Sequence, residues 1–243
     1  MVEAAHSFRF IGQGVYSMAE AGRLTKVPVR NLERWARGYR YTYRGIDRYS
    51  PPIIGSGRHE RDGVPILEFR DIMEVRFLSA FRRAGVSWNV IRRVAGRVQQ
   101  HIKHTHPFAT RVFRTDGRHI LLELITRDDR DHRLVDLISD QYEWNRVVGT
   151  LLVAERVEFS EEDEPIRWWP LGPHRNVVVD PARAFGAPIV AVEGVQTYLL
   201  ARAQALENNI EFVAHWYQVT SQAVRDAVDF ENGARATREV PFR

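Results

Sequence analysis

The chain has 243 residues, of which 44% are hydrophobic and 27% charged, and this balance indicates one or two globular domains rather than a disordered chain. It has no cysteine, which excludes disulfides and thiolate metal sites, and no apolar run approaches the roughly 18 residues that a membrane-spanning helix needs. Residues 1–105 hold 19 Lys and Arg against 9 Asp and Glu, whereas residues 106–243 hold 16 against 22. A basic first half suits a polyanion such as nucleic acid, and an acidic second half suggests a different partner.

The segment "YSMAEAGRLTKVPVRNLERWAR", residues 16–37, has the pattern of two short helices joined by a tight turn. Ser17 and Glu20 have the spacing of a capping box at the start of the first helix. Pro28 suits the first position of the second helix, whose apolar residues recur at helical spacing. The opposite face of this second helix carries Arg30, Asn31, Arg34 and Arg37. We therefore predict a helix-turn-helix in which these four side chains face DNA, because arginine pairs with guanine and asparagine with adenine.

A β-hairpin is predicted next. "YRYTYR" at 39–44 alternates aromatic and polar residues, "GSGRHERDG" at 55–63 is a polar turn, and "VPILEF" at 64–69 is the returning strand. Arg58 and Arg61 would then lie at the hairpin tip, where they would contact phosphate or the minor groove, and Arg40 and Arg44 would contact phosphates along the strand.

Two more helices are predicted after the hairpin. In "RDIMEVRFLSAFRRAG" apolar residues follow one another at spacing three, and Gly85 suits the end of that helix. The residues of this apolar face are Ile72, Val75, Leu78 and Phe81. Ser87 is placed to cap the helix that follows.

Residues 15–98 together resemble a MerR-type winged helix-turn-helix domain. The resemblance implies DNA binding through the second helix and the wing. Because one domain of this type rarely gives enough affinity, we expect a homodimer on an inverted repeat. The wing is longer than is usual in that family, and no long coiled-coil helix follows it. The family's effector-sensing and metal-sensing parts are therefore not implied.

The middle of the chain is predicted to be a connecting region. "TRVFRTDGRHILLEL", residues 110–124, contains the strong turn signal Asp116–Gly117 and is interpreted as a second β-hairpin. A short helix is expected within 131–152, and strands and loops within 157–176. Trp168 and Trp169 suit either a core or an interface.

The segment 177–231 carries a second resemblance. It opens like a strand, continues through a helix to an Asn-Asn turn, and ends in the helix pair "IEFVAHWYQVTSQAVRDAV" with Thr220 as a cap. It is similar to the family known as domain of unknown function 433, whose members are predicted antitoxins. The resemblance implies a VapB-like antitoxin whose partner is a PIN-like ribonuclease toxin. The acidic residues of this segment favour contact with protein over contact with DNA; they are Glu207, Glu211, Asp226, Asp229 and Glu231.

The last residues, 232–243, are short, aperiodic and basic, and we expect a mobile tail. An arginine or aromatic side chain can silence a nuclease by entering its acidic active site, since guanidinium pairs with carboxylates. The candidates for this toxin contact are Arg235, Arg238, Phe242 and Arg243.

No motif for catalysis or for a cofactor stands out. "IGQG" at 11–14 lacks the third glycine of a dinucleotide fingerprint. His101, His104 and His106 lie close together, but without an acidic partner they are expected to be surface residues rather than metal ligands. We therefore expect no enzyme activity, no metal and no cofactor.

These observations predict an α+β fold, mainly helical with small β-hairpins, and a cytoplasmic protein without an export signal. The expected domains are 1–105 for DNA binding, 106–172 as the connecting region, 173–231 as the antitoxin-like helical domain and 232–243 as the tail. The expected function is that of an antitoxin that binds its toxin and represses its own operon. The alternative is a MerR-like transcriptional regulator with a small-molecule pocket lined by Trp144, Trp168, Trp169 and Trp216.

Overall fold

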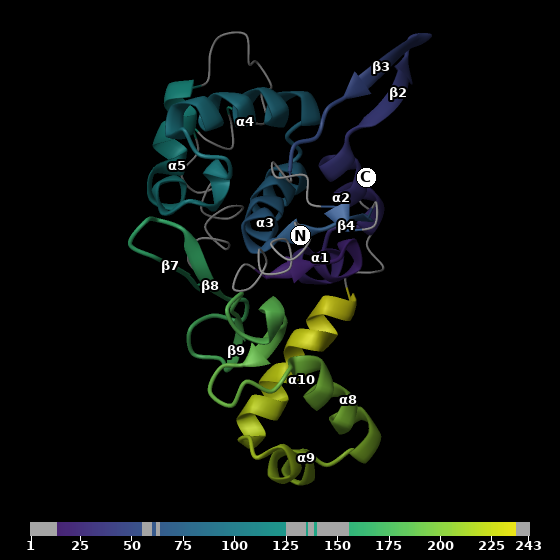
Figure 1. Ribbon diagram of the computed structural model, residues 1–243, viewed down its shortest axis with the longest axis vertical. Helices are drawn as coiled ribbons and strands as arrows, with labels where there is room; N and C mark the ends of the chain where they lie inside the picture. The colour runs from purple at the N-terminus through teal and green to yellow at the C-terminus, as the bar shows by residue number, and fades with distance from the viewer. Residues whose placement is uncertain are drawn as a thin grey trace, which may run out of the picture. The chain divides into compact units, whose positions relative to one another are not determined.

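The computed structural model describes residues 14–54, 60–61, 64–124, 135, 139 and 156–236, which form two compact units. The N-terminal unit comprises Ser17–Ala154 and Phe159–Pro165, and the C-terminal unit comprises Met1–Tyr16, Glu155–Glu158 and Ile166–Arg243. Both units combine helices with small antiparallel sheets (Figure 1), which confirms the predicted α+β class. In the part of the chain that is described, no helix has the length and apolar character to cross a bilayer.

The N-terminal unit is a series of helices interrupted by short strands. Its helices are α1 (Met18–Thr25), α2 (Val29–Arg37), α3 (Phe69–Arg83), α4 (Trp88–Ile102), the 3-10 turn η2 (Pro107–Ala109) and α5 (Arg111–Leu124). Its strands are β2 (Tyr39–Tyr43), β3 (Ile46–Ser50), β4 (Glu60–Arg61), β5 (Val64–Pro65) and β6 (Leu67–Glu68). Strand β2 pairs with β3, and β4 pairs with β5.

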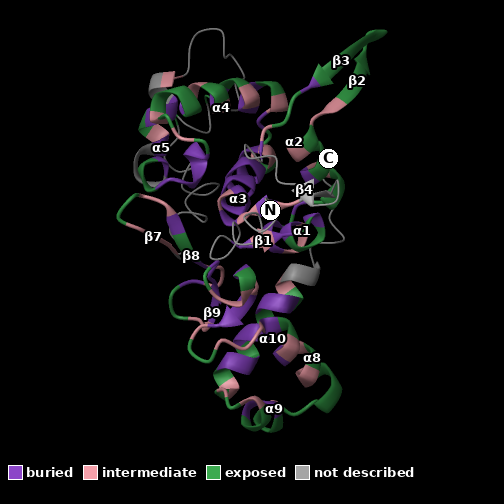
Figure 2. Ribbon diagram, viewed as in Figure 1, coloured by how far each residue is buried: buried purple, intermediate pink, exposed green. Residues whose placement is uncertain are grey.

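Helix α3 forms the centre of the N-terminal unit and is buried along almost its whole length (Figure 2). The four apolar residues that the spacing selected are all buried, so this helix is confirmed. Phe77 packs edge-on against Phe113 at 5.0 Å between ring centroids and stacks on Phe108 at 6.0 Å. Because η2 and α5 supply these rings, the segment after α4 closes the core of the unit.

The predicted β-hairpin at 110–124 is wrong: this segment is the helix α5. Phe113, Ile120 and Leu121 are buried, and their spacing matches a helical face rather than an alternating strand. Gly117 does not make a turn. A Cβ atom added there would lie 3.1 Å from the ring of Phe113, so the glycine lets that ring lie close to the helix. The helix expected within 131–152 lies almost wholly outside the described residues.

The C-terminal unit packs helices beside a small sheet. Its strands are β1 (Val15–Tyr16), β7 (Arg156–Phe159), β8 (Pro165–Trp169), β9 (Val177–Val179) and β10 (Pro188–Val190), and the 3-10 turn η4 (Ala184–Gly186) precedes β10. The sheet has the order β10-β9-β8-β7. Three helices follow, α8 (Thr197–Glu207), α9 (Ile210–Tyr217) and α10 (Ser221–Ala236). Thr220 caps α10 as predicted, because its Oγ1 accepts a hydrogen bond from the backbone N–H of Ala223 at 3.1 Å.

The start of the predicted tail is corrected as well. Helix α10 does not end near Glu231 but continues to Ala236, so that the single Gly233 lies within the helix, where a glycine is tolerated at a cost of about 1 kcal/mol. Arg235 therefore lies on the last turn of a helix, although its side chain is not described. The other three predicted toxin contacts, Arg238, Phe242 and Arg243, lie outside the described residues.

Candidate nucleic-acid interface

Helices α1 and α2 are held at their ends by the residues that the sequence pattern selected. The capping box of α1 is present: Ser17 Oγ accepts from the backbone N–H of Glu20 at 3.3 Å, and the Ser17 N–H donates to Glu20 Oε2 at 2.8 Å. Lys26 ends α1 in the left-handed conformation with φ 59°. Pro28 stands at the N-cap of α2, one position before the expected one. The tight turn leaves α2 free to expose one whole side.

The exposed side of α2 carries the predicted DNA-facing residues together. Arg30, Arg34 and Arg37 are exposed and Asn31 is half-buried, while Leu32 and Trp35 on the opposite side are buried in the core. The Arg34 guanidinium lies 4.5 Å from the centroid of the Tyr39 ring. The cationic face is therefore displayed to solvent and partly held in place by an aromatic ring.

The wing is a different hairpin from the one predicted. Strand β2 pairs with β3, in the register Arg40↔Tyr49 and Tyr43↔Ile46, and not with residues 64–69. The turn consists of Arg44 and Gly45, both with positive φ, 51° and 76°, as a two-residue hairpin turn requires. A two-residue loop closes at a smaller entropic cost than the long loop that the prediction needed.

Consequently, Arg44, which was predicted to lie along the strand, is at the wing tip. Arg61 lies on β4, in the short β4–β5 pair, and its side chain is not described. Arg58 lies outside the described residues. Arg40 is exposed on β2, as predicted.

The wing projects from the helices of its unit and is exposed over nearly its whole surface (Figures 1 and 2). Tyr43 is 50% exposed, and the guanidinium groups of Arg44 and Arg48 lie 5.5 Å and 5.4 Å from its ring centroid. The Tyr49 hydroxyl donates to the Arg37 carbonyl at 3.2 Å, which ties the base of the wing to the end of α2. The exposed side of α2 and the wing are thus joined into one basic and aromatic surface.

A buried polar cluster lies at the start of α3. Asp71 Oδ1 accepts from His106 Nε2 at 3.0 Å, and Glu74 Oε1 accepts from the backbone N–H of Phe108 at 3.3 Å. Burial raises the pKa of Glu74 from its usual 4.5 to about 8, so this carboxyl is mostly protonated at pH 7. Burial alone would lower the pKa of His106, but the hydrogen bond to Asp71 and the attraction to the Glu74 and Asp71 carboxyl groups together outweigh it, and the pKa is raised.

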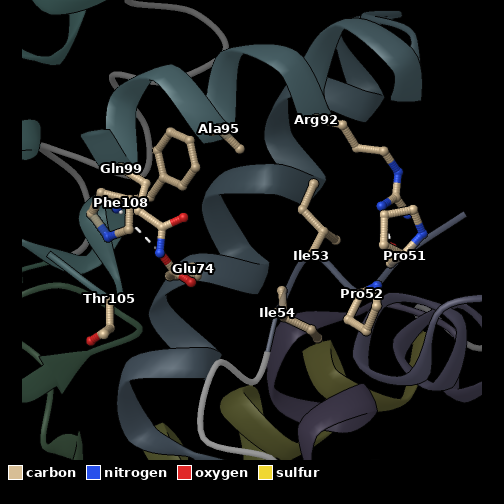
Figure 3. A pocket seen from close by; sticks show the side chains of 12 residues that line it. Pro51, Pro52, Ile53, Ile54, Glu74, Arg92, Ala95, Gln99, Thr105 and Phe108 are labelled. Carbon is tan, nitrogen blue, oxygen red and sulfur yellow. Dashed lines mark hydrogen bonds between the residues drawn. The ribbon is translucent and has the colours of Figure 1, made fainter. Parts of the chain in front are cut away.

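A cavity of about 290 Å³ lies between this cluster and the base of the wing. Glu74 and Phe108 line one side of it, and Pro51 and Arg92 line the other (Figure 3). Arg92 donates a hydrogen bond to the Pro51 carbonyl, directly after the last strand of the wing. None of the three described tryptophans of the predicted small-molecule pocket, Trp168, Trp169 and Trp216, lines this cavity.

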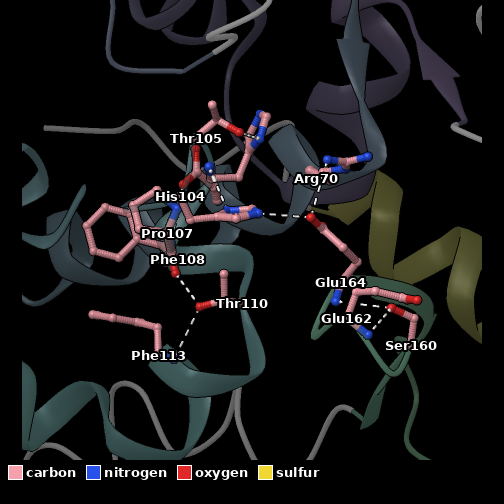
Figure 4. A network of polar contacts seen from close by, with 12 residues as sticks. Arg70, His104, Thr105, Pro107, Phe108, Thr110, Phe113, Ser160, Glu162 and Glu164 are labelled. Atoms are coloured by element: carbon pink, nitrogen blue, oxygen red, sulfur yellow. Dashed lines mark hydrogen bonds and ion pairs between the residues drawn. The ribbon is translucent and has the colours of Figure 1, made fainter. Parts of the chain in front are cut away.

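Two of the three clustered histidines, His104 and His106, contact acidic residues that are distant in sequence. His104 Nε2 lies 2.9 Å from Glu164 Oε1, which also pairs with Arg70 at 3.4 Å (Figure 4). His106 is buried against Asp71, so it is not the surface residue that was expected, whereas His101 is exposed. Among the described residues, no group of three or more potential metal-ligating side chains occurs. Sequence reasoning missed these pairs because the partners lie 35 and 60 residues away.

Two of the acidic residues assigned to protein contact hold the C-terminal unit together instead. Asp226 is fully buried and accepts from Arg175 and from the backbone N–H of Asn176. Glu231 is buried and accepts from the Thr197 hydroxyl at 2.6 Å. Glu207, Glu211 and Asp229 are exposed. Only these three remain available for the role that the sequence suggested.

The predicted tryptophan-lined pocket is not assembled among the described residues. Trp168 is buried in β8, and Trp216 is 72% exposed on α9. The cavity that Trp216 lines contains neither Trp168 nor Trp169. Trp144 lies outside the described residues.

Comparisons with known proteins agree with a DNA-binding N-terminal unit. Residues 14–95 match the family described as "Putative DNA-binding HTH domain". Over 227 residues the chain is 31% identical to "Putative antitoxin VapB45" of Mycobacterium tuberculosis H37Rv, which covers 88% of this chain and 92% of that protein. The crystal structure of Rv2018 from Mycobacterium tuberculosis has the same fold, with a TM-score of 0.66 at 24% identity over 88% of this chain and 96% of that one.

Proposed function

The chain belongs to the family of VapB45, and from this membership we propose that it is an antitoxin that binds a PIN-like ribonuclease toxin and represses its own operon. The observation that carries the proposal is the extent of the likeness, which spans 88% of this chain and 92% of the relative. An antitoxin with a helix-turn-helix domain has the two surfaces that these tasks need. The N-terminal unit would act as a MerR-like winged domain, and the C-terminal unit as the antitoxin domain of the family known as domain of unknown function 433.

For DNA, helix α2 would lie in the major groove. Arg30 and Arg34 would donate paired hydrogen bonds to guanine, and Asn31 would pair with adenine. The exposure of the two arginines on one side of the helix supports this role. Arg37, at the end of the helix and joined to the wing through Tyr49, would contact the phosphate beside the groove.

The wing would bind the sugar–phosphate backbone. Arg44 at the tip and Arg40 on β2 are exposed cations on an extended hairpin, which suits contact with phosphates across the adjacent groove. The tyrosine hydroxyls of β2 would add hydrogen bonds to phosphate. Arg61 on β4 and Arg58 remain candidates for further phosphate contact. Because one such domain covers only a half-site, two copies would bind an inverted repeat.

The change Arg34→Ala is expected to weaken binding to the operator by about 1–3 kcal/mol while leaving binding to unrelated DNA nearly unchanged. The change Arg44→Ala should weaken binding to all sequences alike and should lower the slope of log K against log salt by about one. The measurement is a fluorescence anisotropy titration with the chain's own promoter and with a scrambled duplex, at several salt concentrations.

Arg225→Ala serves as the control for this pair, because Arg225 is an exposed arginine on α10 in the other unit. It should leave both duplexes bound as tightly as by the wild type. If Arg34→Ala and Arg44→Ala also bind like the wild type, then α2 and the wing do not form the DNA-binding surface.

For the toxin, the experiment is co-purification with the product of the neighbouring gene. The full chain, tagged alone, is expected to retain a small acid-rich nuclease and to suppress its RNA cleavage and its toxicity. We propose that Arg235, Arg238, Phe242 and Arg243 enter its acidic site, where guanidinium would pair with the carboxylates that hold Mg²⁺ or Mn²⁺. A chain that ends at Ala236 should therefore lose inhibition while keeping its DNA affinity.

The outcomes separate the parts of the proposal. Inhibition that survives the truncation would exclude the three residues beyond Ala236 as the inhibitory element but would leave the antitoxin function intact. Absence of any partner, combined with tight binding to the promoter, would overturn the antitoxin function.

Tight binding to the promoter without any protein partner would favour a transcriptional regulator that responds to a small molecule. The cavity at the base of the wing supports this alternative. It holds a buried carboxyl and an arginine that is bonded to the strand end of the wing, so a bound molecule there would act directly on a DNA-contacting element.

A further inference from the structure

An apolar groove runs along the outer side of the C-terminal unit between α8 and α9. It has a volume of about 490 Å³. Leu199, Ala203 and Leu206 line it from α8, and Phe212 and Trp216 line it from α9. We call it the α8–α9 groove.

Helices α8 and α9 each have two apolar faces. The inner face is buried against α10, and the outer face lines the groove. On their inner side, Leu200 and Val213 pack with Val224 and Ala227 of α10 in a core with almost no exposure. The outer residues are therefore not the exposed part of a loosely packed core. An amphipathic surface helix shows one apolar stripe, and a helix that is apolar on both sides is buried on both sides.

The exposure of the groove residues is large for apolar side chains. Trp216 is 72% exposed, Leu206 76% and Phe212 47%. The rings of Phe212 and Trp216 stack at 6.2 Å between centroids with an angle of 23°, so they form one flat, rigid surface. Contiguous exposed apolar residues of this kind mark an interaction site, and aromatic residues lead among those that carry binding energy.

The same patch contains both exposed aromatic rings and a hollow. The stacked rings of α9 form one wall of the groove and are largely exposed, and the smaller side chains of α8 form the facing wall. A two-fold axis brings a patch onto itself, so each copy can place its aromatic pair in the groove of the other. A patch that supplies both halves of the fit suits a second copy of the same chain.

The charges at the rim have the same self-complementary character. Arg202 and Glu207 both border the groove and lie five residues apart on α8. In the described part of the chain, neither side chain forms an ion pair with another charged group. A two-fold axis across the groove would set Arg202 of one copy against Glu207 of the other, twice. The mixed signs are unsuited to a polyanion.

We propose that the α8–α9 groove joins two copies of this chain into a symmetric dimer. This inference extends the proposed DNA-binding function, which needs two copies for an inverted repeat, by assigning the surface that holds them. It is independent of where the toxin binds.

The test is the mass of the full chain in solution, measured by sedimentation at micromolar concentrations. The wild type is expected to sediment at twice the 28.2 kDa of one chain, and Trp216→Ala and Leu206→Glu are expected to sediment as single chains with unchanged circular dichroism. Phe185→Ser is the matched control, because Phe185 is 83% exposed but lies on η4 outside the groove. It should leave the dimer intact.

A charge exchange examines the two-fold geometry separately. Arg202→Glu and Glu207→Arg should each raise the dimer dissociation constant about tenfold or more, because each places like charges together twice. The double variant should return it close to the wild-type value. Restoration by the double exchange distinguishes a paired interface from a general loss of apolar surface.

Two results would overturn the inference. One is a wild-type chain that sediments as a single copy, which would leave the antitoxin function itself untouched if toxin and promoter still bind. The other is a Trp216→Ala variant that dimerises as tightly as the wild type. If that variant also loses the co-purified toxin, the groove is the toxin's binding site and not the dimer interface.

Discussion

Asp226→Ala is expected to lower the free energy of unfolding of the C-terminal unit by about 2–3 kcal/mol, because it removes a buried carboxylate that accepts several hydrogen bonds. Asp226 has no exposed surface. It accepts from Arg175 Nε at 2.5 Å, from the Asn176 N–H and side-chain amide at 2.9 and 2.8 Å, and from Gln222 Nε2 at 2.8 Å. These bonds join the segment before β9 to α10, so their loss affects the whole unit.

The same bonds predict how the stability changes with pH. Burial alone would raise the pKa of Asp226, but the hydrogen bonds from Asn176, Gln222 and Arg175 outweigh it and hold the pKa below its usual 3.8. The folded protein therefore releases this proton more readily than the unfolded chain does. The stabilisation is complete above pH 3.8 and is lost as the pH falls through the lower, folded-state pKa. In Asp226→Ala this acid sensitivity should disappear.

Asp229→Ala is the matched control. Asp229 Oδ2 contacts the same Arg175 guanidinium at 2.5 Å, but its side chain is 62% exposed, and an exposed ion pair contributes only about 0–1 kcal/mol. Urea unfolding, followed through hydrogen exchange of peptides from α10, should show a large loss for Asp226→Ala and a small one for Asp229→Ala. Equal losses of unfolding free energy in the two variants would mean that the stabilisation by Asp226 does not depend on the burial of its carboxylate.

Glu74→Gln is expected to stabilise the N-terminal unit at pH 8 and to have little effect at pH 5. The pKa of Glu74 is about 8 in the folded protein and 4.5 when unperturbed. Between these values the folded protein keeps a proton that the unfolded chain releases, so rising pH favours unfolding. The cost is on the order of 1 kcal/mol for each pH unit in that window. Glutamine has the shape of the protonated acid and still accepts from the Phe108 N–H.

The measurement is the thermal unfolding midpoint from pH 5 to pH 8. The wild type should lose stability steadily over that range, and Glu74→Gln should lose much less. Part of the slope will remain, because the raised pKa of His106 acts with the same sign: its stabilisation is complete below pH 6.5 and is lost as the pH rises through the folded-state pKa. Glu33→Gln, at an exposed position on α2, should follow the wild type. A Glu74→Gln profile parallel to the wild type would show that Glu74 ionises normally.

The parts of this protein that could be predicted are those set by neighbours in sequence. The capping box needs only Ser17 and Glu20, three residues apart, and it is present with both of its bonds. The exposed face of α2 follows from the position of its buried residues, Leu32 and Trp35. The apolar spacing of α3 places its core residues correctly for the same reason.

The errors lie where two local signals compete. Asp116–Gly117 is a strong turn signal, yet the apolar spacing of the surrounding residues suits a helix, and burial of Phe113 and Leu121 in the core decides between the two. The wing shows the same competition. Both 46–50 and 64–69 can pair with β2, and the nearer strand pairs because its turn needs only two residues.

By itself, then, the sequence determined the helix-turn-helix, the segregation of charge and the likeness to antitoxins, because helix caps, apolar periods and charge depend on residues within a few positions of one another. Only the tertiary structure decided that His106 meets Asp71 and that Asp226 is a buried support rather than a surface acid. The contact of His106 with Asp71 joins residues 35 positions apart, and that of Asp226 with Arg175 joins residues 51 positions apart. Their formation rests on the packing of the whole unit, which no local pattern encodes.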